Sequence, residues 1–213
     1  LIVGSLILFI ALSEYWDRTL ITLYMATFAV GVSAFSGIIV GSLCSQNDFA
    51  SKSIISLCDF FQTFPSFIYL IPVILLFGIT DTSVMIAAIV YASVPATRYT
   101  VEGLRSVPSS LHDAGSMSGV SKMQRWRLID LPLALPHIML GINQTVIFAL
   151  MMIVLGALIG TEDLGQLIMG SLSRPNGAGI GFTLGIFISF ICLAVDNLIR
   201  TWADERKKLL GIE

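Results

Sequence analysis

The sequence predicts an all-α integral membrane protein, and three observations lead to this fold class. Of its 213 residues, 55% are hydrophobic and only 12% are charged, about half the roughly 25% that is usual in a soluble domain. The mean hydropathy is +0.88. The charged residues also cluster between long neutral runs. In lipid each span must satisfy its own backbone hydrogen bonds, so runs of this length are expected to be helices; a barrel would show short alternating strands.

Uncharged stretches give the expected layout. Residues 19–47, 60–80, 82–97, 131–161 and 175–195 contain no Asp, Glu, Lys or Arg. Four of them reach the roughly 20 residues that a spanning helix requires, and the stretch from 82 does so if it continues to about Val101. We therefore expect one transmembrane domain over residues 1–213 with about six transmembrane helices, at about 1–12, 19–44, 60–79, 82–101, 134–160 and 178–199.

The hydrophobic piece at residues 1–12 has neither a basic leader nor a small-residue cleavage site. We interpret it as the end of a truncated first transmembrane helix and not as a signal peptide. A mature N-terminus is the less favoured alternative, because twelve residues do not span a bilayer.

The distribution of positive charge predicts the orientation. If the spans alternate, ten of the twelve Lys and Arg residues lie on the same side as the C-terminus, and only Arg18 and Arg174 lie on the other. Positively charged loops favour the cytoplasm, so we expect a multi-pass protein with a cytoplasmic C-terminus. The polar segment 107–132 is then cytoplasmic, and the segment 161–177 is an outer loop.

Several functional classes are disfavoured. The three cysteines are isolated, and neither histidine has an acidic or thiol neighbour at metal-ligand spacing, so we expect no disulfide framework and no metal site. No nucleophile elbow or phosphate-binding glycine loop occurs, which argues against an enzyme. The net charge of −2 is too small to suggest a nucleic-acid partner.

The source of energy follows from where ionisable residues fall. An ion-coupled carrier usually keeps such residues inside its spans. Here Asp59, Asp81 and Asp196 fall at the ends of uncharged segments. This pattern disfavours ion coupling and favours mechanical work delivered by a partner.

The segment 107–132 has the pattern of two short helices. Pro108 and the serines after it form a helix start, with Asp113 as a capping-box acid, and Gly119 is suited to close this first helix. Ser121 and Gln124 form a second capping box. We expect the second helix to end at Leu131-Pro132. Small residues on the first helix would let another protein dock closely; the alternative is an amphipathic loop on the bilayer surface.

The spacing within this segment matches a known signature. Asp113-Ala114-Gly115, three residues, Gly119, nine residues, Ile129, one residue and Leu131-Pro132 resembles E-A-A-x3-G-x9-I-x-L-P, the motif of binding-protein-dependent ABC importer permeases. Asp113 stands where Glu is usual, and Gly115 where Ala is usual. The glycine costs about 1 kcal/mol of helix stability relative to alanine.

Three further segments resemble one particular group of these permeases. "QTFPSFIYLIPVILLFG" at 62–78, "PLALPHIMLGINQT" at 132–145 and "DLGQLI" at 163–168 are similar to permeases of glycine betaine, proline and choline importers. The likeness covers about residues 18–200. It implies a type I ABC importer permease fold in the bacterial cytoplasmic (inner) membrane.

The resemblance also implies a mechanism and partners. A second permease copy, two ATPase subunits that use ATP and magnesium, and an outer substrate-binding protein would complete the transporter, with membrane lipid around it. Alternating access would be driven through the ATPase-coupling residues, which are Asp113, Ala114, Gly115, Met117, Gly119, Ile129, Leu131 and Pro132. No cofactor is expected on this chain itself.

Neutral polar residues are the candidates for a transport pathway or gate: Gln62, Phe64, Asn143, Gln144, Thr145, Asp163 and Gln166. Polar groups inside a span are expected to face the bundle or the pathway and not lipid. The alternatives are helix packing for the buried residues and a plain surface loop for the outer pair.

The expected cargo is a methylated or quaternary amine such as glycine betaine, choline or trimethylamine N-oxide. The aromatic stripe from Phe60 to Tyr69 does not separate these solutes, because such a stripe more often serves packing. Alternatives are a permease for another small solute such as an amino acid, an ion-coupled carrier, and a non-transporting scaffold.

Overall fold

The computed structural model describes residues 16–156, 159–161, 164–175 and 177–210, and every regular element in these ranges is a helix. The predicted span at 1–12 lies outside them. The elements in chain order are α2 (Trp16–Cys44), α3 (Asp48–Thr63), α4 (Phe67–Phe77), α5 (Asp81–Arg105), α6 (Ser109–Met117), α7 (Lys122–Arg125), the π-helical η1 (Trp126–Asp130), α8 (Leu131–Gly156), α9 (Leu164–Leu172) and α10 (Ala178–Leu210).

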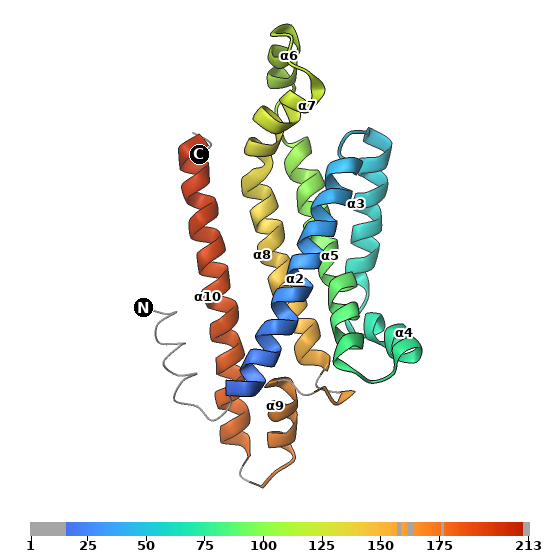
Figure 1. The fold of residues 1–213 in the computed structure, drawn as a ribbon, viewed down its shortest axis with the longest axis vertical. Coiled ribbons are helices and arrows are strands. Elements are labelled where there is room, and N and C mark those ends of the chain that lie inside the picture. Colours follow the sequence, from blue (N-terminus) through green and yellow to red (C-terminus); the bar gives the residue numbers. More distant parts are fainter. Residues whose placement is uncertain (1–15, 157–158, 162–163, 176, 211–213) are drawn as a thin grey trace.

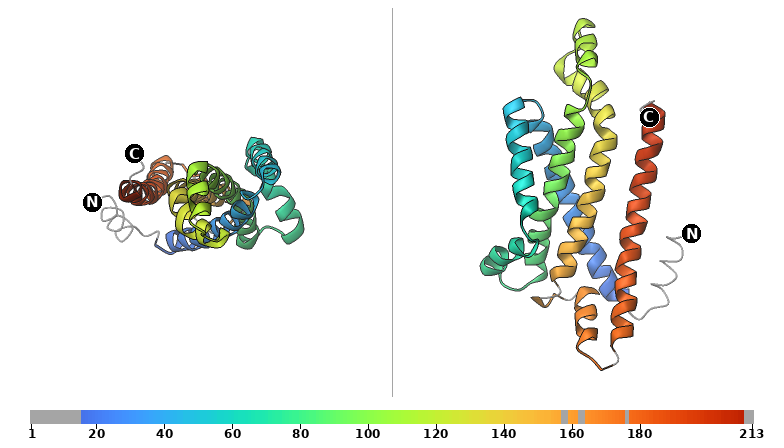
Figure 2. Two further views of the ribbon diagram at one scale, coloured as in Figure 1. Left: turned by 90° about the horizontal axis from the view of Figure 1, so that it is seen from above. Right: turned by 180° about the vertical axis from the view of Figure 1, so that it is seen from behind.

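The long helices α2, α5, α8 and α10 run along the length of the molecule (Figures 1 and 2). α6 and α7 project from one end, the same end at which α10 finishes, and α9 lies at the opposite end. The segment predicted to couple to a partner and the C-terminal end of α10 therefore share one side of the bundle, as the alternation of spans requires.

Among the described residues, α2, α5 and the continuous helix Lys122–Gly156 are long and apolar enough to cross a membrane. They cover the predicted spans at 19–44, 82–101 and most of 134–160. The predicted span at 178–199 falls within α10, and Ala178–Phe190 is an apolar segment of this helix. Large apolar side chains are exposed on the outside of the bundle, including Phe35 of α2, Leu75 of α4 and Phe182 of α10. A surface of this kind is suited to lipid.

The stretch 60–79 is not one straight helix. α3 and α4 meet at 87°, and Phe64 adopts extended backbone at φ −75° and ψ 137°. The next residue is Pro65, whose ring disfavours helical backbone in the residue before it. The search for uncharged stretches did not detect this break. It also placed the start of the helix too late: α3 begins at Asp48, and the Asn47 side chain caps it by accepting a hydrogen bond from the Phe49 amide.

The helix after Ser121 also differs from expectation, because Leu131-Pro132 does not end it. The chain passes from α7 through η1 into α8 without a break, and the Leu131 amide donates to the Trp126 carbonyl in the wide π pattern. Pro132 is the second residue of α8. Since the helix is continuous at this point, the missing amide of Pro132 leaves one helical hydrogen bond unmade.

Glycines bring α5 into close contact with the helices on either side. On α2, Gly37 faces Ala96 and Thr97, and Gly41 faces Thr100. On α8, Gly141 faces Tyr99, and Gly156 faces Val84. Small residues in this spacing allow membrane helices to approach closely. Gly37, Gly41 and Gly156 therefore serve helix packing within one subunit.

The buried core lies where α2, α4, α5, α8, α9 and α10 meet. Its largest fully buried apolar side chains include Leu70, Val84, Met152, Ile153, Leu164 and Phe187. At the other end of the bundle, Arg105 of α5 pairs with Asp48 at the start of α3.

Replacing Gly37 with alanine is expected to destabilise the bundle by about 1–3 kcal/mol, because over-packing a filled core has this cost. The added methyl would lie 2.9 Å from the Thr97 amide nitrogen. Gly31 on the same helix provides the matched control, since a methyl there meets nothing within 4 Å. The measurement is the thermal unfolding midpoint in detergent by circular dichroism. Equal midpoints for Gly37→Ala and Gly31→Ala would contradict the close approach of α2 and α5.

Candidate functional site

The projecting end of the bundle begins with α6, and a glycine closes this helix. Gly119 has φ +73°, which glycine adopts without steric cost. The Val120 amide donates to the Gly115 carbonyl at 3.2 Å, and the Ser118 amide donates to the Ala114 carbonyl at 3.1 Å. The hydrogen bond from Val120 to Gly115, which spans five residues, is typical of a glycine-terminated helix. The predicted end of the first helix is confirmed.

The second short helix starts at the predicted capping box. The Gln124 amide donates to the Ser121 hydroxyl at 3.3 Å, and the Gln124 side-chain oxygen accepts from the Ser121 amide at 3.0 Å. This reciprocal pair satisfies two amide donors that a helix start leaves open. The capping box predicted for the first helix does not form. α6 already begins at Ser109, so Ser110 lies inside the helix and is not its N-terminal cap.

A buried carboxylate joins the two halves of this segment. Asp130 is only 7% exposed. One of its oxygens lies 3.0 Å from His112 Nε2 on α6, and the other lies 3.5 Å from Arg125 Nε on α7. The first contact is an ion pair when His112 is protonated. Sequence reasoning missed this link, because His112 and Asp130 are far apart in the chain and come together only when the segment folds back.

The residues of the coupling motif divide into two groups. Asp113, Ala114, Met117 and Gly119 are exposed, and Met117 is 91% exposed. Gly115 is buried against α7 and η1, and a methyl built on it would lie 3.2 Å from Ile129 Cδ1. Ile129, Leu131 and Pro132 are partly buried. Gly115 therefore faces inward and does not present the open surface that the sequence suggested.

Exposed apolar side chains surround the outward group. Besides Met117, Met123 of α7 is 69% exposed and Leu128 of η1 is 72% exposed. This apolar tip stands beyond the end of the helix bundle (Figure 1). A patch of this kind is typical of a protein interaction site.

A cavity of about 390 Å³ lies between α3, α5 and α8. It is lined by Gln62 of α3, by Pro95, Arg98, Tyr99 and Glu102 of α5, and by Gln144 and Phe148 of α8. Two of the predicted pathway residues, Gln62 and Gln144, are therefore brought to one cavity although they are far apart in the sequence.

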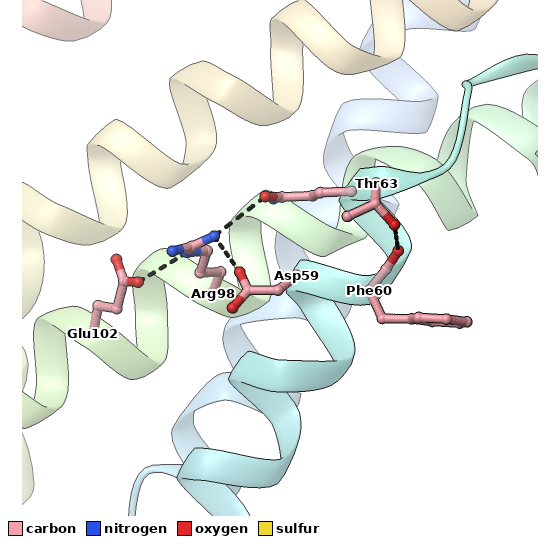
Figure 3. A network of polar contacts seen from close by, with 6 residues as sticks. Asp59, Phe60, Thr63, Arg98 and Glu102 are labelled. Carbon is pink, nitrogen blue, oxygen red and sulfur yellow. Dashed lines mark hydrogen bonds and ion pairs between the residues drawn. The ribbon is translucent and has the colours of Figure 1, made fainter.

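A charged network that includes three of the lining residues, Gln62, Arg98 and Glu102, joins α3 to α5, and Figure 3 shows its contacts. Arg98 Nε donates to Glu102 Oε1 at 2.9 Å. Its Nη1 donates to Asp59 Oδ1 at 2.5 Å and to Gln62 Oε1 at 3.3 Å. The Arg98 side chain is 32% exposed, whereas that of Asp59 is 51% exposed.

Sequence reasoning missed this network because it counted Arg98 with the positive charges on the cytoplasmic side, although the predicted span 82–101 contains it. The structure places Arg98 about two turns inside the end of α5. One sequence signal was available, since Arg98 and Glu102 stand four residues apart and so face the same side of a helix. Ionisable groups thus do occur within the helices, and not only at their ends.

The other predicted pathway residues that the structure describes pack against, or form hydrogen bonds with, residues of the bundle. Phe64 stacks edge-on with Phe60 at a centroid distance of 4.7 Å. Asn143 is buried in the bundle, and the Thr145 hydroxyl donates to the Gly141 carbonyl at 2.9 Å. Gln166 of α9 accepts from Arg18 of α2 at 3.3 Å. Asp163 lies outside the described residues.

In the ranges that the structure describes, no group of three His, Cys, Asp or Glu residues could hold a metal ion. What the arrangement offers instead is an apolar, exposed tip at one end and a polar cavity between α3, α5 and α8.

Comparison with solved structures identifies the fold. The chain superposes on a chain of the MetNI methionine ABC transporter, in an inward-facing conformation, with a TM-score of 0.79. The match covers 92% of this chain and 99% of that chain at 20% sequence identity. The type I permease fold predicted from the sequence is therefore confirmed.

Comparison with curated proteins gives the relatives. The chain is 62% identical over its whole length to the trimethylamine N-oxide transport system permease protein TmoV of Pelagibacter ubique, and 42% identical over 95% of its length to TmoV of Ruegeria pomeroyi. It covers 30% and 31% of those two proteins, so it spans about a third of their length. It is 32% identical to the glycine betaine permease protein OpuAB of Bacillus subtilis, covering 91% of this chain and 68% of that protein.

A family model described as "Binding-protein-dependent transport system inner membrane component" matches residues 33–208. This range contains the coupling segment and the cavity. Proteins of this kind are ABC transporter permease subunits and not enzymes. The chain belongs to the family of inner membrane components of binding-protein-dependent transport systems.

Proposed function

We propose that this chain is the permease part of an ATP-driven importer that carries a small methylated amine, foremost trimethylamine N-oxide, into the cytoplasm. The observation that carries the proposal is the 62% identity over the whole chain to a trimethylamine N-oxide permease. The cavity supports it, because small polar solutes need a polar path through an apolar bundle.

The projecting tip is the docking site for the ATPase. Exposed Met117, Met123 and Leu128 provide apolar contact area, and exposed Asp113 adds a charge at its edge. ATP and magnesium belong to that partner. The tip and the C-terminal end of α10 then lie in the cytoplasm, in agreement with the positive-inside distribution.

The tip is built to transmit force into the membrane. Asp130 holds α6 against α7 and η1, and η1 continues into α8 without a break. A push on α6 therefore moves the outer part of a helix that reaches the cavity through Gln144 and Phe148. Closure of two ATPases would rock this helix, which is the expected form of alternating access.

The remaining partners complete the transporter. A second permease unit, a copy of this chain or a homologous segment, would close the pathway. An outer substrate-binding protein would deliver the solute at the end of the bundle that holds α9, where Asp163 and Gln166 belong to the contact surface or the outer gate. Lipid covers the apolar outer faces of the helices.

Uptake by the full transporter tests the proposal. The full-length protein is reconstituted in liposomes with its ATPase and binding protein, and uptake of labelled trimethylamine N-oxide, glycine betaine and choline is measured with and without ATP. ATP-dependent accumulation of at least one of these amines is expected. Accumulation without ATPase would indicate a carrier instead, and uptake of none of them would refute the proposal.

Changing Met117 to aspartate is expected to weaken ATPase binding at least about tenfold, because it places a charge in an apolar contact. The same change at Met169, which lies on α9 at the opposite end of the bundle, is the matched control and should leave ATPase binding unchanged. The measurement is co-purification of the ATPase and its dissociation constant. Equal affinities for the two variants would mean that the tip is not the docking site.

Changing Asp130 to asparagine is expected to loosen α6, because removing the buried charge leaves His112 and Arg125 without their common anion. Hydrogen–deuterium exchange of residues 109–118 should then rise at least about tenfold in the permease, as one lost charged contact implies. Asp113→Asn provides the control, since Asp113 is exposed. Unchanged exchange in Asp130→Asn would show that Asp130 does not hold the segment together.

A further inference from the structure

The cavity between α3, α5 and α8 has more specific chemistry than a polar path requires. It is lined by one guanidinium, one carboxylate, two amides and two aromatic rings, and a second carboxylate, Asp59, contacts the guanidinium from α3. Its volume of about 390 Å³ lies in the range of roughly 300–1,000 Å³ that is typical of small-molecule sites. What each group still has available for a solute decides which solute fits.

Arg98 is held firmly yet keeps donors for a solute. A guanidinium carries five N–H groups. The hydrogen bonds to Glu102, Asp59 and Gln62 use Nε and Nη1. In the described part of the chain these are the hydrogen bonds of the Arg98 side chain, so Nη2 can donate to an acceptor in the cavity. The ion pairs fix the guanidinium in place, which lowers the entropy cost of binding.

Gln144 lies on α8, across the cavity from α3. Within the described ranges its side-chain amide makes no hydrogen bond to another residue. A partly buried amide inside an apolar helix is costly unless water or a ligand satisfies it. Two donors from different helices, Arg98 and Gln144, thus line the same space.

The other groups favour a positive charge. Asp59 and Glu102 together outweigh Arg98 by one negative charge when all three are ionised. The rings of Tyr99 and Phe148 also line the space, and Phe148 is held in a stack on Tyr91 at a centroid distance of 4.8 Å. Aromatic faces attract methylated ammonium groups.

We propose that this cavity is a binding site within the permease for a dipolar methylamine, in which the anionic oxygen accepts hydrogen bonds from Arg98 and Gln144 while the methylated nitrogen faces Glu102 and the ring of Tyr99. The proposal rests on the proposed function and adds the selectivity of the pathway. The site prefers an N-oxide or a betaine over choline, because choline has the ammonium group but no anionic oxygen.

The first test replaces Gln144 with leucine in the full reconstituted transporter. The solute delivered per ATP hydrolysed should fall about tenfold for trimethylamine N-oxide, as expected for one lost hydrogen bond to an anionic oxygen. ATP hydrolysis stimulated by loaded binding protein should persist, because the ATPase contacts lie elsewhere. Thr183→Val on α10 is the control: its exposed hydroxyl donates to the Gly179 carbonyl of its own helix at 2.8 Å, and it does not line the cavity, so delivery should be unchanged.

The second test replaces Arg98 with lysine, which keeps the charge but loses the forked donors. The ratio of choline uptake to trimethylamine N-oxide uptake, measured in competition, should rise about tenfold, since only the N-oxide loses its contact. A structural role of Arg98 alone would lower both rates equally and leave the ratio unchanged. If one variant fails to assemble with its ATPase, the other decides the question.

The outcomes separate the two proposals. If the unaltered transporter imports no methylated amine, the proposed function fails. If it imports one, and Gln144→Leu keeps its delivery per ATP or Arg98→Lys keeps its choline ratio, the proposed function stands and the assigned site is wrong.

Discussion

The close approach of α5 to α2 and α8 is the contact on which the rest of the structure depends. Gly37 and Gly41 bring α2 against Ala96, Thr97 and Thr100, and glycines of α8 pack on the other side of α5. Dispersion between closely packed backbones replaces the hydrophobic effect, which offers little between helices in lipid. With α5 fixed between its neighbours, its other face is left to form the cavity with α3 and α8.

The charged network can persist in this setting because it is assembled from one fixed helix. Arg98 and Glu102 share a face of α5, so their mutual geometry is set before α3 joins them. Asp59 and Gln62 then add contacts from α3. An arginine in a membrane bundle is costly alone, but paired charges that line a polar space are tolerated and usually serve function. The same pairing holds α3 upright beside α5 up to the bend before α4.

Features that depend on neighbouring residues in the chain could be predicted from the sequence, and features that depend on folding back could not. Gly119 closes α6 and Ser121 caps α7 as predicted, because these signals act within one helical turn. Pro65 signals the break in the sequence, but spans defined only by the absence of charged residues do not take proline into account. No local pattern determines the contact of His112 with Asp130, because it depends on tertiary structure. The same is true of the placement of Gln62 and Gln144 at one cavity.

The π-helical turn at Trp126–Asp130 sets an angular register between the tip and the cavity. A π turn holds an extra residue, and one residue corresponds to about 100° of rotation around a helix. The extra residue thus allows the exposed side of η1 to point outward while the polar residues of α8 point into the bundle. Because α8 is packed against α5, shortening this turn by one residue would keep the helix continuous but would rotate the tip by about 100° relative to Gln144 and Phe148. The phase of the helix, and not only its length, therefore sets how the tip is oriented relative to the cavity.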